Sequence, residues 1–170
     1  MSVDTQLRPF VISWTFNAPR ERVWKAWTER ERLIQWFGPK GCGSLHTANL
    51  DLRPGGMFHY CMRSPDGKDM WGKFVYREII APGRIVLVNS FSDEKGGLTR
   101  HPMSPAWPLE MLSKTTFTGH QGKTVLTLEW SPLNATEAER DTFDSAHAGM
   151  KQGWTGTMEQ LADYLAKTTD

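Results

Sequence analysis

Residues 43 to 130 form an almost unbroken succession of strand-type segments, with no helical pattern between them. The short turn sequences RPGG, SPDG, APG and GHQG separate these segments at residues 53–56, 64–67, 81–83 and 119–122. Stretches rich in glycine, proline and aspartate are typical of tight chain reversals. Strands joined by tight turns pair antiparallel, whereas parallel pairs need long crossovers. The sequence therefore predicts an antiparallel meander and argues against a parallel sheet.

A strand and a pair of short helices are expected before this meander. The alternating segment at residues 8–16 predicts the strand. Pro19 then suits the start of a first helix, and Thr28 with Glu31 has the spacing of a capping box for a second one. The glycine at position 38 is expected to end the second helix.

A long C-terminal helix is expected from Thr136, whose capping box closes on Glu139, to about Lys167. Its apolar residues share one stripe at helical spacing, which is typical of a helix packed on a core. They are Phe143, Met150, Trp154, Met158, Leu161 and Leu165. Because strands and helices do not alternate along the chain, we predict one α+β domain over residues 1–170.

Three glycines, Gly149, Gly153 and Gly156, interrupt this expected helix. Each internal glycine costs a helix about 1 kcal/mol relative to alanine, so the fold must offset that cost. At about 100° per residue the glycines form a second stripe beside the apolar one. Two explanations stay open: close approach of another backbone segment, or volume left unfilled beside the helix.

Charge and composition exclude several kinds of partner. The net charge is +1 and acids alternate with bases, so the basic face that nucleic acids need is absent from the sequence pattern. No apolar run approaches the roughly 20 residues of a membrane span, and the N-terminus has no signal-peptide pattern. Two cysteines do not form a secretory disulfide framework. We expect a cytoplasmic protein that binds neither nucleic acid nor membrane.

The first hairpin of the meander can be placed in register from its apolar rows. A one-residue slip would turn one row to water, so both rows are expected to face inward. The predicted pairs are Leu52 with Phe58, Leu50 with Tyr60 and Ala48 with Met62.

The same strand parity separates four potential metal ligands. Cys42 and His46 are expected to point inward, and His59 and Cys61 outward, so one ion cannot bind all four. The sequence also lacks a nucleophile elbow, a protease-type cysteine and a glycine-rich phosphate loop. We therefore expect no metal and no cofactor, and the catalytic residues of any reaction stay unknown.

Several segments together resemble a known family. They are FNAPRERVWKAWTERERLIQWFGP, DLRPGG, SPDG, REIIAPGRIVLV and GWTGTMEQLADYL. They are similar to the activator-of-Hsp90-ATPase homologues, a group within the START-like (SRPBCC, polyketide cyclase) superfamily, over roughly residues 8–166. The resemblance implies a helix-grip fold, in which a curved antiparallel sheet wraps around a long C-terminal helix and leaves a cavity between them. None of the matching segments is a catalytic signature.

The resemblance also implies which residues line that cavity. The inward rows of the hairpin would contribute together with side chains from later strands, the terminal helix and the long connection at residues 92–108. Connections of that length are commonly lids or binding loops. The expected ligand-binding residues are Leu50, Phe58, Tyr60, Met62, Trp71, Trp107, Met111, Met150 and Trp154.

Three functions stay open from the sequence. The first is a module that binds a small apolar or aromatic molecule through burial and a few polar contacts. The second is an enzyme of cyclase or hydrolase type, with His46 and Tyr60 as candidate proton-transfer groups. The third, implied by the family name, is a co-chaperone that contacts a heat-shock ATPase. We rank binding of a small hydrophobic ligand first.

Overall fold

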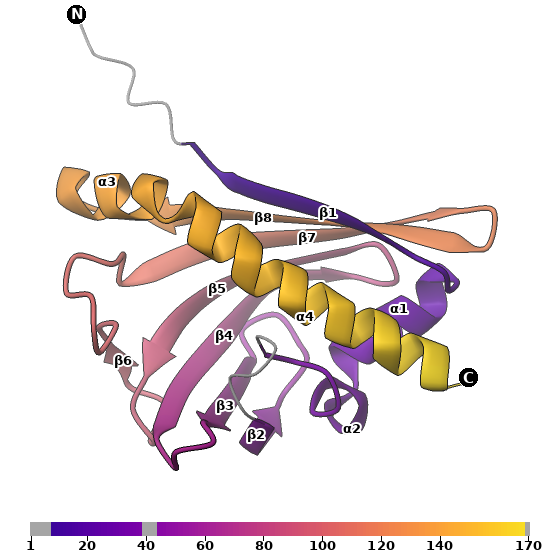
Figure 1. Ribbon diagram of the computed structural model, residues 1–170, viewed down its shortest axis with the longest axis horizontal. Coiled ribbons are helices and arrows are strands. Elements are labelled where there is room, and N and C mark those ends of the chain that lie inside the picture. The colour runs from indigo at the N-terminus through magenta and orange to yellow at the C-terminus, as the bar shows by residue number, and fades with distance from the viewer. Residues whose placement is uncertain (1–7, 39–43, 169–170) are drawn as a thin grey trace, which may run out of the picture.

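A curled antiparallel sheet wraps around one long C-terminal helix in the computed structural model of the protein (Figure 1). The structure describes residues 8–38 and 44–168. This arrangement confirms the predicted α+β helix-grip fold with two short helices after the first strand. In chain order the elements are β1 (Phe10–Phe16), α1 (Arg20–Thr28), α2 (Arg30–Leu33), β2 (Ser44–Leu50), β3 (Met57–Arg63), β4 (Asp69–Ile80), β5 (Arg84–Ser92), β6 (Leu98–Thr99), β7 (Glu110–His120), β8 (Lys123–Leu133), α3 (Glu137–Ser145) and α4 (His147–Lys167).

The order of strands across the sheet is β1-β8-β7-β5-β4-β3-β2, and β6 pairs with β5 beside this path. Every pairing is antiparallel, as the turn sequences predicted. Most neighbours in the sheet are also neighbours along the chain. One exception is β5, which pairs with β7 although β6 lies between them along the chain. The other is the first strand, which pairs with the last one: Phe10 lies opposite Trp130, and Phe16 opposite Thr124.

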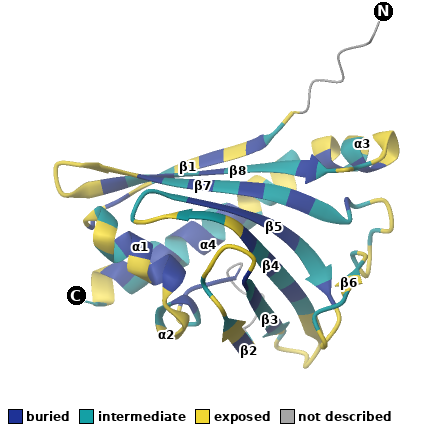
Figure 2. Ribbon diagram, turned by 180° about the vertical axis from the view of Figure 1, so that it is seen from behind, coloured by how far each residue is buried: buried dark blue, intermediate teal, exposed yellow. Residues whose placement is uncertain are grey.

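One face of the sheet is covered and the other is not. Buried positions alternate with partly exposed ones along β7 and β8, which is visible from behind in Figure 2. Because successive strand residues point to opposite faces, this alternation marks a sheet packed on one side. The element that covers this face is α4. Within residues 8–38 and 44–168, no helix has both the length and the apolar character needed to cross a membrane.

The contact between α4 and the sheet is uneven along the helix. Its buried residues are Trp154, Thr157, Met158, Leu161 and Leu165. The first two turns, residues 147–153, bury none. The ring of Trp154 stacks on Trp27 of α1 at 6.3 Å between centroids and meets Trp130 of β8 edge-on at 5.4 Å. Before these two turns in the chain, Phe143 of α3 is again fully buried.

The register of the β2–β3 hairpin differs from the predicted one by two residues. Leu50 pairs with Phe58, and the predicted partner Leu52 lies beyond the end of β2. The prediction was wrong because the turn takes up residues 51–56, two more than the RPGG stretch alone. A shift by two keeps every side chain on its face of the sheet, so Ala48 and Phe58 are still buried.

Two predicted helix features are wrong and one is confirmed. Thr28 does not cap α2, because its hydroxyl donates to a backbone carbonyl one turn back at 2.8 Å, and Glu29 occupies the cap position. The expected terminal helix breaks at Ala146 into α3 and α4. The capping box between Thr136 and Glu139 is confirmed, with both reciprocal hydrogen bonds present.

The glycines have two different roles. At Gly149 and Gly153 in α4, an added Cβ would meet no heavy atom within 4 Å beyond the backbone of its own helix. Close approach of another segment therefore explains neither glycine. Gly153 lies beside unfilled volume between the helix and the sheet, whereas Gly149 is exposed to solvent. Gly72 in β4 is the opposite case, because a Cβ there would lie 2.5 Å from the Tyr60 hydroxyl oxygen and 2.6 Å from Cζ. The Tyr60 ring covers Gly72, its partner in the β3–β4 pairing.

We expect Gly72→Ala to lower the free energy of unfolding by about 1–3 kcal/mol, because the packed Tyr60 ring must shift. Gly149→Ala is the matched control, since the same methyl group is added where nothing lies within 4 Å. It should raise the free energy of unfolding by about 0.5–1 kcal/mol. Urea unfolding followed by tryptophan fluorescence measures both changes. A Gly72→Ala variant as stable as the wild type would contradict the close packing of Tyr60.

Candidate functional site: a cavity between the sheet and the C-terminal helix

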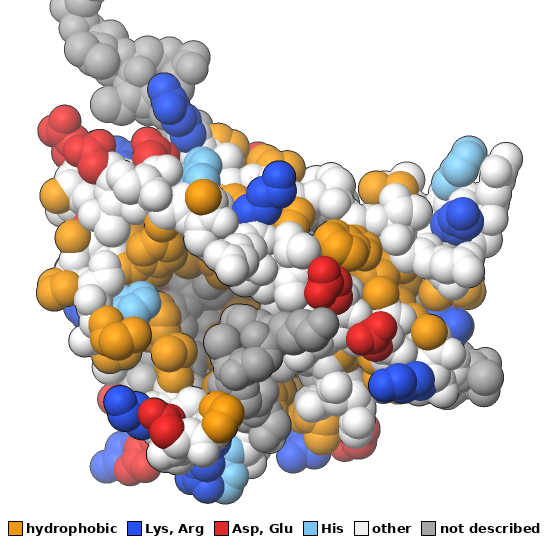
Figure 3. Space-filling view, in the orientation of Figure 1, with side chains coloured by type: hydrophobic (Ala, Val, Ile, Leu, Met, Phe, Trp, Pro, Cys, Tyr) orange, Lys and Arg blue, Asp and Glu red, His pale blue; other side chains and the backbone are white. Residues whose placement is uncertain are grey.

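A cavity of about 300 Å³ lies between the inner face of the sheet and α4. Figure 3 shows the molecule hollowed on this face, with hydrophobic side chains on the visible walls. The described lining residues come from the segment after α2, from strands β3 to β5, β7 and β8, from the β5–β7 connection and from α4. They are Phe37, Gly38, Tyr60, Met62, Met70, Trp71, Gly72, Phe74, Asn89, Ser90, Phe91, His101, Trp107, Pro108, Met111, Trp130, Met150, Gly153, Trp154 and Thr157.

Seven of the nine residues predicted to bind a ligand line this cavity. They are Tyr60, Met62, Trp71, Trp107, Met111, Met150 and Trp154. That these side chains contact a ligand stays a prediction. The structure therefore brings together, at one cavity, residues that lie almost 100 positions apart in the sequence.

Three of the nine predicted residues contribute differently from what was expected. Phe58 belongs to the apolar core and Leu50 is partly buried against it, and neither lines the cavity. Phe58 is fully buried, with its ring 5.0 Å from that of Tyr60, so it supports the wall from behind. Trp71 lies beside the cavity on β4, but its ring stacks on His59 at 5.0 Å. Its neighbour on the chain, at position 72, is the residue that faces inward beneath Tyr60.

Asn89 is a polar residue in the cavity wall that the sequence analysis missed. It lies on β5 opposite Phe74 of β4 and Met111 of β7, and both partners also line the cavity. Its side chain is only 9% exposed, and its Oδ1 atom has no hydrogen-bond partner among the described residues. The apolar run at residues 85–88 hides the strand alternation that would have placed Asn89 on the inner face.

The connection between β5 and β7 supplies His101, Trp107 and Pro108 to the cavity wall. It is more regular than predicted, because its two-residue strand β6 pairs with Phe91 and Ser92 at the end of β5. Trp107 was predicted to line the cavity, whereas His101 was not among the predicted residues.

His101 presents a neutral ring to the cavity. The ring packs on Phe91 with centroids 4.6 Å apart, and its Nδ1 accepts a hydrogen bond of 3.0 Å from the backbone N–H of Met103. A nitrogen that accepts carries no proton, so Nε2 holds the proton of the neutral ring. Burial lowers the pKa of His101, which keeps the imidazole uncharged at pH 7.

The other polar groups of the wall are hydroxyls. The Tyr60 hydroxyl makes no hydrogen bond to a described residue, and burial raises the pKa of Tyr60, so the phenol stays protonated. The Thr157 hydroxyl donates to the Gly153 carbonyl at 3.1 Å and retains its capacity to accept. None of the described lining residues is Asp, Glu, Lys or Arg. Binding of a charged ligand would therefore be unfavourable, because the ligand would lose its hydration without meeting an opposite charge in these walls.

Glu139 joins the β5–β7 connection to α3. One carboxylate oxygen accepts the Thr136 backbone N–H at 2.9 Å, and the other accepts the Arg100 guanidinium at 2.5 Å. Arg100 also donates to the carbonyl of Trp107 at 3.4 Å. The carboxylate that closes the capping box of α3 thus also holds the connection that carries three cavity residues.

Residues 17–166 match the sequence profile of the family described as Activator of Hsp90 ATPase homolog 1-like protein. The chain belongs to this family. The match confirms the resemblance on which the sequence analysis relied. No curated protein matches the chain.

Solved structures of bacterial proteins share the fold of this family member. A protein from Nitrosomonas europaea is 24% identical with a TM-score of 0.74, and the alignment covers 97% of both chains. A protein from Mycobacterium smegmatis is 26% identical with a TM-score of 0.70, covering 95% of this chain and 93% of the other. One from Staphylococcus epidermidis is 25% identical with a TM-score of 0.71, covering 100% and 96%.

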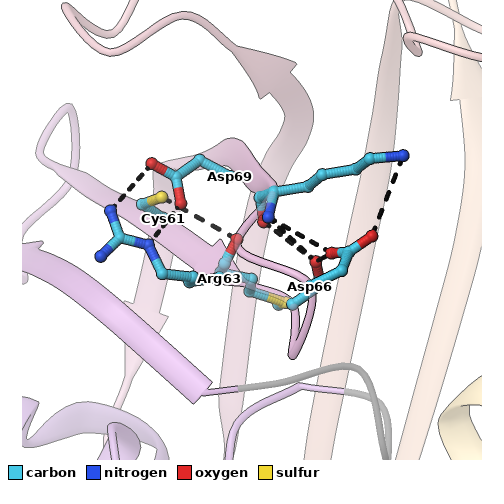
Figure 4. Close-up of polar contacts among 7 residues, drawn as sticks. Cys61, Arg63, Asp66 and Asp69 are labelled. Atoms are coloured by element: carbon cyan, nitrogen blue, oxygen red, sulfur yellow. Dashed lines mark hydrogen bonds and ion pairs between the residues drawn. The ribbon is translucent and has the colours of Figure 1, made fainter.

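The outer face of β3 and β4 holds a polar cluster that is separate from the cavity (Figure 4). Arg63 donates to both carboxylate oxygens of Asp69, at 2.7 and 3.1 Å. Cys61 lies beside this pair on the outer face, the face predicted for it, and its side chain is fully buried there. Burial and the adjacent Asp69 raise the pKa of the Cys61 thiol, which keeps it protonated.

The predicted orientation of His46 is wrong. His46 is exposed, because a β-bulge between Leu45 and Thr47 interrupts the alternation of β2. Cys42 lies outside the described residues. In the part of the chain that the structure describes, no group of three or more His, Cys, Asp or Glu side chains could hold a metal ion.

We expect Glu139→Gln to reduce stability in a pH-dependent way. The Thr136 backbone N–H and the Arg100 guanidinium lower the pKa of Glu139. A carboxyl group with a lowered folded-state pKa stabilises the fold above its unfolded value of about 4.3, and this contribution is lost as the pH falls through the folded-state pKa. The difference in unfolding free energy between wild type and variant should stay constant from pH 7 to about 5 and shrink below about pH 4.

Urea unfolding at several pH values measures this difference. Glu137→Gln is the matched control, because Glu137 is an exposed acid in the first turn of the same helix. It should change stability little at any pH. A stability difference for Glu139→Gln that does not depend on pH would show that the carboxylate charge has no part in the effect.

Proposed function

We propose that the protein binds a small apolar or aromatic molecule in the cavity between the sheet and α4. The observation that carries this proposal is a void of about 300 Å³ whose described walls are mostly aromatic and methionine side chains. Small-molecule sites are typically concave and apolar with a few polar groups, and span about 300–1,000 Å³. The volume is at the lower end of that range, which favours a ligand of one or two rings.

Two features support a cavity that the sequence maintains. Gly153 lies in its wall, where a Cβ would meet nothing within 4 Å. Alanine at this position would stabilise the helix by about 1 kcal/mol, but its methyl group would take up part of the cavity. The glycine is therefore understandable if the cavity has to stay open for a ligand. The methionines at positions 62, 111 and 150 add flexible, polarisable surface that adapts to the shape of a ligand.

The enzyme alternative has less support than binding. Its two candidate proton-transfer residues lie apart, since Tyr60 lines the cavity and His46 is exposed on β2. The raised pKa of Tyr60 also makes its phenol a poor base at neutral pH. We therefore assign no reaction to the cavity.

Family membership favours a second candidate function, contact with an Hsp90-type chaperone. An increase in ATP turnover by the cognate chaperone on addition of this protein would support it. If the protein neither increases ATP turnover nor is retained on immobilised chaperone, the chaperone function is refuted. The cytoplasmic location expected from the sequence stays a prediction.

We expect the wild-type protein to bind naphthalene at one site with a Kd below about 1 mM. That affinity corresponds to about −4.1 kcal/mol, or roughly 0.4 kcal/mol for each of about ten carbon atoms, which is modest for a buried ring. Two-dimensional amide NMR measures the affinity and the location together. The amide signals of Gly72 and Gly153 should shift in proportion to occupancy, while that of Gly149 should not.

A matched pair of helix variants tests whether the cavity is the site. Gly153→Leu places a side chain in the cavity and should abolish naphthalene binding. Gly149→Leu makes the same change one turn earlier, at an exposed position outside the cavity, and should leave the affinity within about twofold of wild type. Equal binding by both variants, or no saturable binding to the wild type, would refute the proposed function.

A further inference from the structure

The unpaired amide of Asn89 is the feature of the cavity that apolar packing does not explain. Asn89 is 9% exposed, and its Oδ1 atom is fully buried without a hydrogen-bond partner in the part of the chain that the structure describes. Buried polar groups are nearly always paired in native proteins, because an unpaired one keeps the full cost of losing water. Such an atom in the wall of a cavity therefore points to a partner that is not part of the chain.

The nearest residues on the strands beside Asn89 do not supply that partner. On β4 and β7 the residues directly opposite are Phe74 and Met111, and on β5 the next residue on the same face is Phe91. All three line the cavity and have apolar side chains. A leucine of similar size would fit this environment better than an amide. The Asn89 side chain thus lies in the cavity wall, and its buried Oδ1 atom requires a hydrogen-bond donor, which a molecule in the cavity supplies once the amide rotates toward it.

The same walls favour an uncharged molecule. The described lining residues include no acidic or basic side chain other than His101, whose ring accepts from the Met103 backbone N–H and is buried against Phe91. An anionic or cationic group would leave water without gaining an opposite charge.

We propose that Asn89 determines ligand specificity, so that the cavity selects uncharged ring compounds that carry a hydrogen-bond donor, a hydroxyl or a ring N–H, for its Oδ1 atom. This inference rests on the proposed function, because it names the class of ligand for the same cavity. In this proposal the Asn89 amide strengthens binding through a hydrogen bond, which the apolar residues of the wall cannot form.

A series of three naphthalene probes tests the inference on the wild-type chain by titration calorimetry. Naphthalene has the ring alone, 2-naphthol adds a neutral donor, and 2-naphthoate adds a negative charge. We expect 2-naphthol to bind roughly tenfold more tightly than naphthalene, the effect of one buried hydrogen bond to an otherwise unpaired acceptor. We expect 2-naphthoate to bind more weakly than naphthalene.

Two variants locate the source of the preference. In Asn89→Leu, the affinities for 2-naphthol and naphthalene should become equal, while naphthalene binds at least as tightly as to the wild type. Ser92→Ala is the matched control, because the Ser92 Oγ atom is also buried and unpaired on β5 but does not line the cavity. It should retain the tenfold preference for 2-naphthol.

Thermal unfolding without ligand gives an independent readout. Asn89→Leu should raise the melting temperature by roughly 2–4 °C, because it removes an unpaired buried amide. A lowered melting temperature would show that the amide has a structural partner and would overturn the inference.

The possible failures are distinguishable. Equal binding of naphthalene and 2-naphthol to the wild type would overturn the role of Asn89 and leave the proposed function intact. So would a preference for 2-naphthol that persists in Asn89→Leu, or binding of 2-naphthoate as tight as that of 2-naphthol. Absence of binding by all three probes would overturn the proposed function as well. The comparison of probes on the wild type needs no variant to fold.

Discussion

The uneven contact between α4 and the sheet is the constraint on which the rest of the structure depends. From Trp154 to Leu165 the helix buries a regular apolar stripe, and each large side chain contributes about 1.5–3 kcal/mol when fully buried. The preceding two turns bury no residue. Protein interiors normally close such gaps, because voids lose dispersion contacts. Here the strongly packed half fixes the helix direction, and the first half can remain above a void.

This geometry divides polar chemistry between the inside and the outside. Ion pairs such as Arg63–Asp69 lie on the outer face or, like Arg100–Glu139, at the connection between strands and helix. The inner wall is uncharged among its described residues and has few polar groups. In such a low-dielectric environment one amide has a large influence, because each unmet hydrogen bond costs more than it would in water. Selectivity of the cavity can therefore depend on very few residues.

The fold could be predicted from the sequence further than the site could. The turn sequences predicted the antiparallel order, and the Thr136–Glu139 capping box predicted where the C-terminal helical region begins. The β2–β3 register failed, because turn length decides register and the RPGG stretch gave no sign that the turn takes up six residues. The alternation of side chains along β3 nevertheless predicted correctly that Tyr60 and Met62 lie on the inner face. Asn89 escaped because it follows four apolar residues in a row, where face assignment needs the neighbouring strands rather than local alternation.

The pairing of β1 with β8 has a consequence for how the chain is made. Phe10 pairs with Trp130, 120 positions later in the chain, so the first strand emerges from the ribosome long before its partner exists. Contacts of such sequence separation slow folding, and an unpaired strand edge is prone to aggregation while it waits. Helix α1, which follows β1, carries Trp24 and Trp27, and their burial also depends on later segments, because their rings pack on Phe117 and Trp154. Newly synthesised chains must therefore be kept apart, in the cell or in an expression host, until nearly the whole domain has been translated.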